Sequence, residues 1–274
     1  MKKIIGLIGS PRKLGNCEIM LKEISQQIPE AHELQLVRLP ELNILPCKGC
    51  YRCLFKEEMC VLNDDFEEVL NLIIEADALM LAAPAYFLGA NASLKRFLDR
   101  GLAFYAHIDK LWGKPAVGVG IAGIRDREGY TMLCINSFLK LILASNKYSR
   151  IIYGALPGEI FFHAENKKTA SDMATALFGA RQEQTGPRCP LCWGDTFQFL
   201  GDNSIRCMLC SNQGIIKFIH AKPAFDIERA GHELFLEKRD VFEHKEWLQG
   251  MKNRFFKEKK KLKEISLGYR DNRN

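Results

Sequence analysis

Apolar and polar positions along the first 180 residues alternate between short hydrophobic runs and longer amphipathic segments. Nearly continuous apolar runs predict buried strands, and apolar residues at three- and four-residue intervals predict helices. The strands are expected at 3–8, 33–39, 78–83, 115–122 and 151–156. The helices are expected at 16–28, 66–76, 91–103, 130–144 and 167–180.

This regular alternation predicts an α/β fold. Strands that are apolar on both faces, each followed by a helix, form a parallel sheet covered by helices on both sides. Five such units predict a flavodoxin-like, doubly wound, five-stranded parallel sheet. In that arrangement ligands bind at the carboxyl ends of the strands, near the switch between the first and third strands.

The pattern breaks after residue 184, where a second pair of cysteine motifs begins. We expect three parts: an α/β domain at 1–184, a small four-cysteine module at 185–222 and a charged helical tail at 223–274. The formal charge of +6 comes from the last 24 residues, which hold nine Lys or Arg and three Asp or Glu. The basic character is therefore a property of the tail.

Length and composition suggest a cytoplasmic protein without a membrane segment. The 47% hydrophobic content suits a globular protein, and no apolar run approaches the roughly 20 residues that span a bilayer. The first residues, MKKIIGLIGS, suggest a strand and not a signal peptide, because the apolar stretch is short and no cleavage site follows.

Eight of ten cysteines fall into two tight groups, which favours metal binding over disulfides; Cys17 and Cys134 remain as small buried residues.

The loop after the first strand is a candidate phosphate site. GSPRKLGN, residues 9–16, joins a strand to a helix, where backbone N–H groups and the helix dipole favour an anion. Ser10 and Asn16 can donate hydrogen bonds, Arg12 adds charge, and Gly15 allows close approach. The loop lacks the GK[ST] ending of a Walker motif and is no GxGxxG fingerprint.

The first cysteine group is spaced C-x2-C-x2-C-x6-C. Cys47, Cys50, Cys53 and Cys60 are too close for normal disulfides but can surround one compact iron–sulfur centre. Zinc binding or free thiols are the alternatives. Pro46 and Gly49 supply the tight turns of such a loop.

The second group has the spacing of two zinc-ribbon knuckles. CPLC and CMLC place Cys189, Cys192, Cys207 and Cys210 around one metal, with a short hairpin between them. Four thiolates favour Zn²⁺, although a rubredoxin-like iron uses the same ligands.

Residues 1–180 resemble the NAD(P)H-dependent FMN reductases, and within them the iron–sulfur flavoproteins. The resemblance rests on GSPRKLGN, CKGCYRCLFKEEMC with the following DDF, and APAYFLGANASLKRFLDR. It implies FMN bound by the first loop, a 4Fe–4S cluster on the first cysteine group, and a homodimer or homotetramer. The flavin ring is expected near these residues: Pro84, Ala85, Tyr86, Phe87, Gly89 and, close behind, Asn91.

The flavin contacts leave some alternatives open. Tyr86 and Phe87 either cover the flavin or are core aromatics. Gly123 and Arg125, after the fourth strand, form a second candidate contact, in which Arg125 either stabilises an anionic reduced flavin or lies on the surface.

The leading hypothesis is an FMN-dependent oxidoreductase that passes electrons through a 4Fe–4S cluster to or from a ferredoxin-like carrier. A second hypothesis is an NAD(P)H-dependent FMN or quinone reductase without a cluster. A third hypothesis is a redox sensor or nucleic-acid-associated protein that acts through the ribbon and the basic tail. Nucleic acid is an unfavoured partner for this chain.

Overall fold

The computed structural model of the chain describes residues 1–55, 59–182 and 185–270. Its first two thirds contain a parallel sheet with the order β2-β1-β3-β5-β6, and β4 pairs antiparallel with the end of β3. The flavodoxin-like fold class is therefore confirmed. The strands are β1 Lys2–Ile8, β2 His32–Arg38, β3 Ala78–Tyr86, β4 Gly89–Ala90, β5 Pro115–Ala122 and β6 Ser145–Tyr153.

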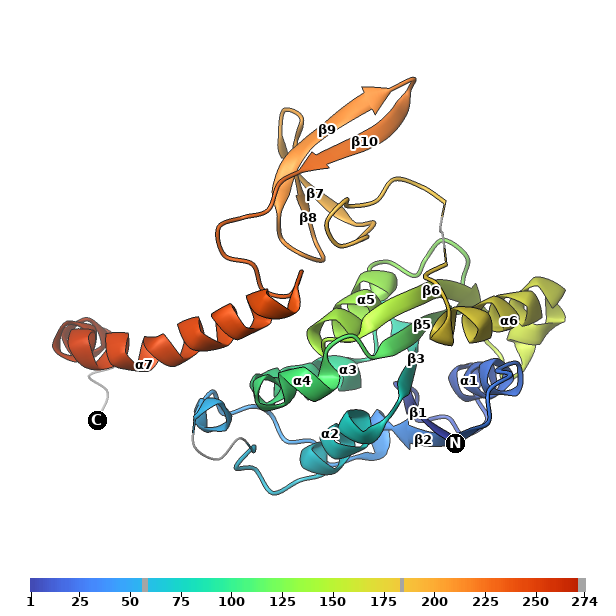
Figure 1. Cartoon of the computed structure of the whole chain (residues 1–274), viewed down its shortest axis with the longest axis horizontal. Coiled ribbons are helices and arrows are strands. Elements are labelled where there is room, and N and C mark those ends of the chain that lie inside the picture. The colour runs from blue at the N-terminus through green and yellow to red at the C-terminus, as the bar shows by residue number, and fades with distance from the viewer. Residues whose placement is uncertain (56–58, 183–184, 271–274) are drawn as a thin grey trace.

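Helices cover both faces of this sheet (Figure 1). One face packs against α1 and α6, and the other packs against α2, α3, α4 and α5. Phe97 links the second group, because its ring lies 4.9 Å from Phe66 and 5.9 Å from Phe138. The helices are α1 Asn16–Gln26, α2 Phe66–Glu75, α3 Ala92–Leu98, α4 Ile108–Leu111, α5 Thr131–Leu141 and α6 Ala164–Phe178.

Two predicted elements differ from the structure by the largest number of residues. The last strand begins at Ser145 and not at 151, because β6 is an edge strand whose first half, SNKYS, carries polar side chains and does not form an apolar run. The helix predicted at 91–103 ends at Leu98, and a 3₁₀ helix, Gly101–His107, continues the chain.

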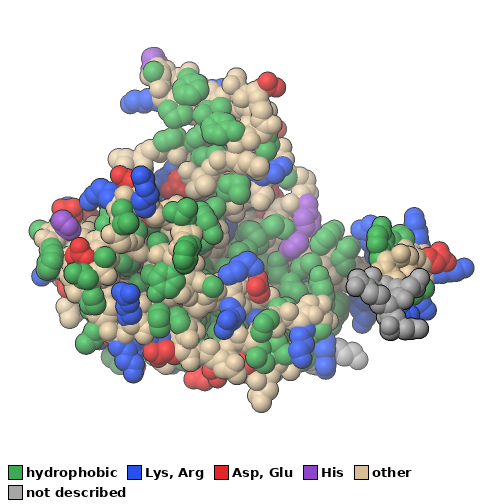
Figure 2. All heavy atoms as spheres, turned by 180° about the vertical axis from the view of Figure 1, so that it is seen from behind, with side chains coloured by type: hydrophobic (Ala, Val, Ile, Leu, Met, Phe, Trp, Pro, Cys, Tyr) green, Lys and Arg blue, Asp and Glu red, His purple; other side chains and the backbone are tan. Residues whose placement is uncertain are grey.

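The four-cysteine module forms a separate antiparallel sheet, the ribbon, above β6 and α5 in Figure 1. Its strand order is β10-β9-β8-β7, and it continues to Ile227, beyond the predicted boundary at 222. Apolar side chains gather on its outer part in Figure 2, where Phe199, Phe218 and Ile219 are exposed. The strands are β7 Phe197–Gly201, β8 Ser204–Cys207, β9 Gln213–Ile219 and β10 Lys222–Ile227.

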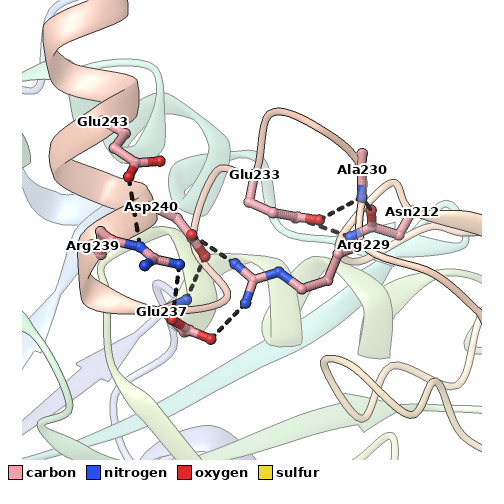
Figure 3. Close-up of polar contacts among 8 residues, drawn as sticks. All are labelled: Asn212, Arg229, Ala230, Glu233, Glu237, Arg239, Asp240 and Glu243. Atoms are coloured by element: carbon pink, nitrogen blue, oxygen red, sulfur yellow. Dashed lines mark hydrogen bonds and ion pairs between the residues drawn. The ribbon is translucent and has the colours of Figure 1, made fainter.

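The segment between the ribbon and the last helix is held by a polar network (Figure 3). Arg229 pairs with Asp240 at 2.8 Å and with Glu237 at 2.5 Å, and Glu237 and Asp240 form the capping box of α7, Lys238–Leu267. Asn212 of the ribbon donates to Glu233 at 3.0 Å. The start of α7 is therefore fixed to the ribbon.

The helix α7 is the charged helical tail that the sequence predicts, although it begins only at Lys238. It runs away from the ribbon past α4 (Figure 1), and Lys238 pairs with Asp109 of α4 at 2.6 Å. Within the described ranges, no helix combines the length and apolarity that a membrane span requires.

Candidate functional site

A pocket of about 220 Å³ lies at the carboxyl ends of the parallel strands, where the fold places a ligand. It collects most of the residues that the sequence analysis proposes for FMN. The proposed residues that line it are Ser10, Arg12, Gly15, Asn16, Pro84, Ala85, Tyr86 and Gly123.

The first loop closes one side of this pocket with the N-terminus of α1. The backbone N–H of Arg12 donates to the Ser10 hydroxyl at 3.3 Å, and Gly15 is the extended N-cap residue. A Cβ on Gly15 would lie 3.0 Å from Cβ of Arg12, so this tight turn favours glycine. The first N–H groups of α1 have no partner within the helix, so they can donate hydrogen bonds to a bound anion.

Asn16 has a different role from the predicted phosphate donor. Its Nδ2 donates to the Gly154 carbonyl at 2.9 Å, and its Oδ1 accepts from the Gly158 N–H at 2.9 Å. The buried side chain therefore ties the first loop to the loop after β6. That second loop contributes pocket residues that the sequence analysis did not include: Gly154, Ala155 and Pro157. The only sequence signal for these three residues is their position directly after the fifth predicted strand, which is β6 in the structure.

Glu18, in the first turn of α1, stabilises the first loop. It accepts the Leu14 N–H at 2.6 Å and pairs with Lys22 at 2.7 Å and with Arg38. Burial alone would raise the pKa of Glu18, but these hydrogen bonds outweigh it and lower the pKa to about 2. The carboxylate is therefore charged throughout the physiological range and holds the loop.

The hairpin that joins β3 to β4 forms the opposite rim. Ala85 pairs with Ala90, Tyr86 pairs with Gly89, and both turn residues have positive φ, 47° at Phe87 and 69° at Leu88. A two-residue turn of this kind normally uses Asn or Gly, so Phe-Leu is strained. Tyr86 lines the pocket, whereas Phe87 is fully exposed and is not a core aromatic. Strained and exposed backbone of this kind is common in loops that contact ligands.

Gly89 and Arg125 do not line the pocket. Gly89 is buried against Tyr130, whose ring lies 2.7 Å from the position of a glycine Cβ. Arg125 stacks over the Tyr153 ring, with 4.8 Å between the guanidinium carbon and the ring centroid. Asn91 instead caps α3, because its side chain accepts the Ser93 N–H at 2.9 Å. Among the cationic residues Arg125 is the nearest to Gly123 in sequence, but its guanidinium stacks on Tyr153 and does not line the pocket.

The first cysteine group converges on a second, smaller cavity. Cys47, Cys50, Cys53 and Cys60 all line it, although residues 56–58 between the last two lie outside the described residues. Gly49, at φ 59°, makes the tight turn, and its N–H donates to the Cys47 Sγ at 3.4 Å. Burial, followed by the neighbouring Cys60 and Cys50, raises the pKa of Cys53 to about 11. Four thiols that repel one another as thiolates require a cation or a metal centre when all four are ionised.

A buried arginine supplies part of that positive charge. Arg100 is 2% exposed, and its Nε donates to the Cys60 Sγ at 3.2 Å. Its Nη1 donates to Asp64 at 2.6 Å and to the Leu45 carbonyl at 3.0 Å. Burial would raise the pKa of Asp64, but the hydrogen bonds from Arg100 and from backbone N–H groups lower it. Arg100 ends the segment SLKRFLDR, and nothing in the local sequence indicates this role.

The helix α7 lies against the cysteine loop. Gln249 donates to the Leu54 carbonyl at 2.6 Å, and the Lys252 amine lies 4.8 Å from the centroid of the Phe55 ring. The basic end of the chain therefore begins beside the first cysteine group, while Cys47 and Cys50 remain exposed.

The second cysteine group is compact. The four Sγ atoms of Cys189, Cys192, Cys207 and Cys210 lie within 4.8 Å of one another, with 3.8 Å between Cys189 and Cys210. A tetrahedral Zn²⁺ with bonds of about 2.3 Å places its sulfurs about 3.8 Å apart. These four residues can therefore hold one metal ion, as the spacing predicts.

The two knuckles of this group are equivalent in backbone geometry. Trp193 and Ser211 each follow the second cysteine of a pair with φ 65°. Their N–H groups donate to the carbonyls of Cys189 and Cys207, at 2.9 Å and 2.8 Å. Repeated knuckles of this kind turn backbone N–H groups toward the sulfurs of a tetrathiolate site.

Comparisons with known proteins show the family to which the chain is similar. The profile of the NADPH-dependent FMN reductase family matches residues 2–133. An iron–sulfur flavoprotein of Archaeoglobus fulgidus is 34% identical over 180 residues, which are 64% of this chain and 78% of that protein. An iron–sulfur flavoprotein of Methanocaldococcus jannaschii is 37% identical over 127 residues, 44% of this chain and 64% of that protein.

The whole architecture, ribbon and long helix included, has a solved counterpart. The structure of a flavone reductase superposes with a TM-score of 0.73 and covers 99% of this chain and 98% of its own. The two sequences are 18% identical, so the likeness concerns the fold.

Proposed function

This chain belongs to the iron–sulfur flavoproteins of the NADPH-dependent FMN reductase family, and we propose that it passes electrons between FMN and a 4Fe–4S cluster. It is an FMN-dependent oxidoreductase. The observation that carries the proposal is the convergence of four cysteines on one cavity, with the buried Arg100 donating to Cys60.

The pocket at the carboxyl ends of the strands has the donor set that FMN requires. The α1 terminus and Arg12 would hold the phosphate, and Tyr86 would lie against the ring. Gly123 and the loop after β6 leave room for the ring edge, since they present backbone and small side chains. When bound, FMN supplies two-electron chemistry, and the protein contributes orientation and exclusion of water.

Cys47, Cys50, Cys53 and Cys60 would hold the cluster, whose iron–sulfur chemistry is one-electron transfer. The exposure of Cys47 and Cys50 leaves one side of that centre open to a redox partner. A ferredoxin-like carrier or NAD(P)H is the proposed electron source. All ten cysteines lie within the described residues and none forms a disulfide, which fits the proposed reducing compartment such as the cytoplasm.

A homodimer or homotetramer is also proposed. The flavin rim exposes several large apolar side chains, among them Phe87, Leu88, Ile124 and Leu156. A rim of this kind, beside an open ligand pocket, is the type of surface that a second copy covers.

The ribbon is proposed to bind Zn²⁺ structurally. Its buried apolar cluster is small, and zinc supplies folding free energy to such modules. Zinc is redox-inert, so the ribbon would take no part in electron transfer.

Anaerobic purification followed by visible spectroscopy tests this function. We expect flavin bands over a broad shoulder at about 400 nm that reductant bleaches, as for a 4Fe–4S cluster. Flavin bands without the shoulder, even after reconstitution with iron and sulfide, would replace the proposal with a cluster-free FMN or quinone reductase. Absence of flavin after addition of FMN would contradict both functions.

A further inference from the structure

A cavity of about 300 Å³ lies at the opposite end of the sheet from the flavin pocket, and neither FMN nor the cluster is proposed to bind in it. Its walls come from the first half of β6, the end of α5 and the first knuckle of the ribbon. The cavity is therefore a junction between the α/β domain and the ribbon.

The charge of this junction is positive. Four basic residues line the cavity, and the described lining residues include no Asp or Glu. Burial lowers the pKa of Lys140, because its ammonium group is partly removed from water. A desolvated cation of this kind is costly unless an anion compensates it. The four are Lys140, Lys147, Arg181 and Arg188.

Neighbouring groups offset only part of this charge. Arg188 pairs with Asp195 at 3.3 Å, and Cys192, Cys210 and Asp240 act on Lys140, although Asp240 is itself paired with Arg229. A tetrathiolate bound to Zn²⁺ would carry two negative charges, fewer than the four positive charges that line the cavity.

The cavity also offers flat apolar surfaces and polar groups that suit an organic molecule. Trp112 and Trp193 both line it. A hydrogen-bonded row forms another wall, in which Ser149 donates to Asn146 and Asn146 donates to Asn136, each at 3.0 Å. Indole rings stack on planar ligands, and amides and hydroxyls orient polar substituents.

We propose that this junction binds a small organic anion with a planar ring. The volume is at the lower end of ligand pockets, which accommodates a nucleoside monophosphate or an aromatic carboxylate and excludes a dinucleotide. The anionic group would contact Lys140, and the ring would lie against Trp193. Because both sides of the junction contribute, the ligand would fasten the ribbon to the sheet.

Calorimetry and tryptophan fluorescence on the full-length holoprotein test this proposal at low salt. The probes are AMP and 4-hydroxybenzoate, with adenosine and inorganic phosphate as partial ligands. We expect saturable, one-site binding of AMP or 4-hydroxybenzoate with a change in tryptophan emission, because two of the three tryptophans line the cavity. Binding of AMP alone identifies a phosphate ligand, and binding of 4-hydroxybenzoate alone a carboxylate; each supports the proposal.

Lys140→Met is expected to weaken binding at least tenfold, the effect of losing a charge-assisted hydrogen bond. Arg181→Gln, at a more exposed position, provides a second variant that should fold. Lys168→Met is the matched control, because Lys168 is exposed on α6 and pairs with Asp172. The proposal is overturned if neither probe binds up to about 5 mM, a free energy near −3 kcal/mol. It is also overturned if phosphate alone binds as tightly as AMP, or if Lys140→Met and Arg181→Gln bind like the control.

Discussion

Arg100 donates from Nε to the Sγ of Cys60 across 3.2 Å while its Nη1 pairs with Asp64 at 2.6 Å. One buried guanidinium thus links the first cysteine group to the core of the α/β domain. Its ring partner is Phe66, 4.4 Å from the guanidinium carbon to the centroid. Arg100 therefore sets both the position of the cysteine loop and the charge beside it.

Replacement of Arg100 by Met should destabilise the protein by about 3 kcal/mol or more, because it leaves Asp64 as an unpaired buried charge. The added change Asp64→Asn should recover part of this loss. Urea unfolding of the two variants measures the difference. Arg96→Met, at an exposed arginine in α3 shortly before Arg100, is the control and should remain within about 0.5 kcal/mol of the wild type.

The same substitution should lower the reduction potential of the bound cluster. Loss of a positive charge next to Cys60 disfavours the more negative, reduced form. A spectroelectrochemical titration compares the reconstituted Arg100→Met/Asp64→Asn variant with Asp64→Asn, so that only the arginine charge differs between the two proteins. An unchanged or higher potential would show that Arg100 only supports the loop.

The side chain of Asn16 should be important for the flavin pocket although it is bound to protein groups. Asn16→Ala leaves the Gly154 carbonyl and the Gly158 N–H without their partner, which should cost about 1–3 kcal/mol. Because the loop after β6 is then released, FMN affinity should also fall, and fluorescence titration with FMN measures it. Gln27→Ala, near the end of α1, should alter neither quantity; if Asn16→Ala matches it, the linking role is wrong.

Glu18 predicts a specific acid sensitivity. Its folded-state pKa of about 2 lies below the ordinary 4.5, so its contribution is fully present above about pH 4.5 and is lost as pH falls toward 2. The shift corresponds to about 3 kcal/mol. Urea unfolding between pH 6 and 2.5 should show the wild type losing its advantage over Glu18→Gln across this window. A constant difference between the two proteins at every pH would contradict the assignment.

Sequence periodicity predicted the parallel sheet well because its central strands are apolar on both faces. It placed β6 too late because the first half of this edge strand, SNKYS, is polar and forms no apolar run. The Phe87-Leu88 turn was not predictable, since neither residue favours positive φ. The contribution of Arg100 could not be predicted, because a buried ion pair between residues 64 and 100 leaves no local pattern in the sequence. The cysteine groups could be predicted, because their spacing is a local pattern.

Metal content of paired cysteine variants tests the central claim most directly. Cys53→Ser lies in the first group and Cys192→Ser in the ribbon, so each should remove one metal centre and leave the other. We expect anaerobically prepared wild type to contain about four irons and one zinc per chain. Cys53→Ser should then lose iron and retain zinc, and Cys192→Ser should do the reverse. Iron that persists in Cys53→Ser, or a wild type that binds zinc at both groups, would contradict the account.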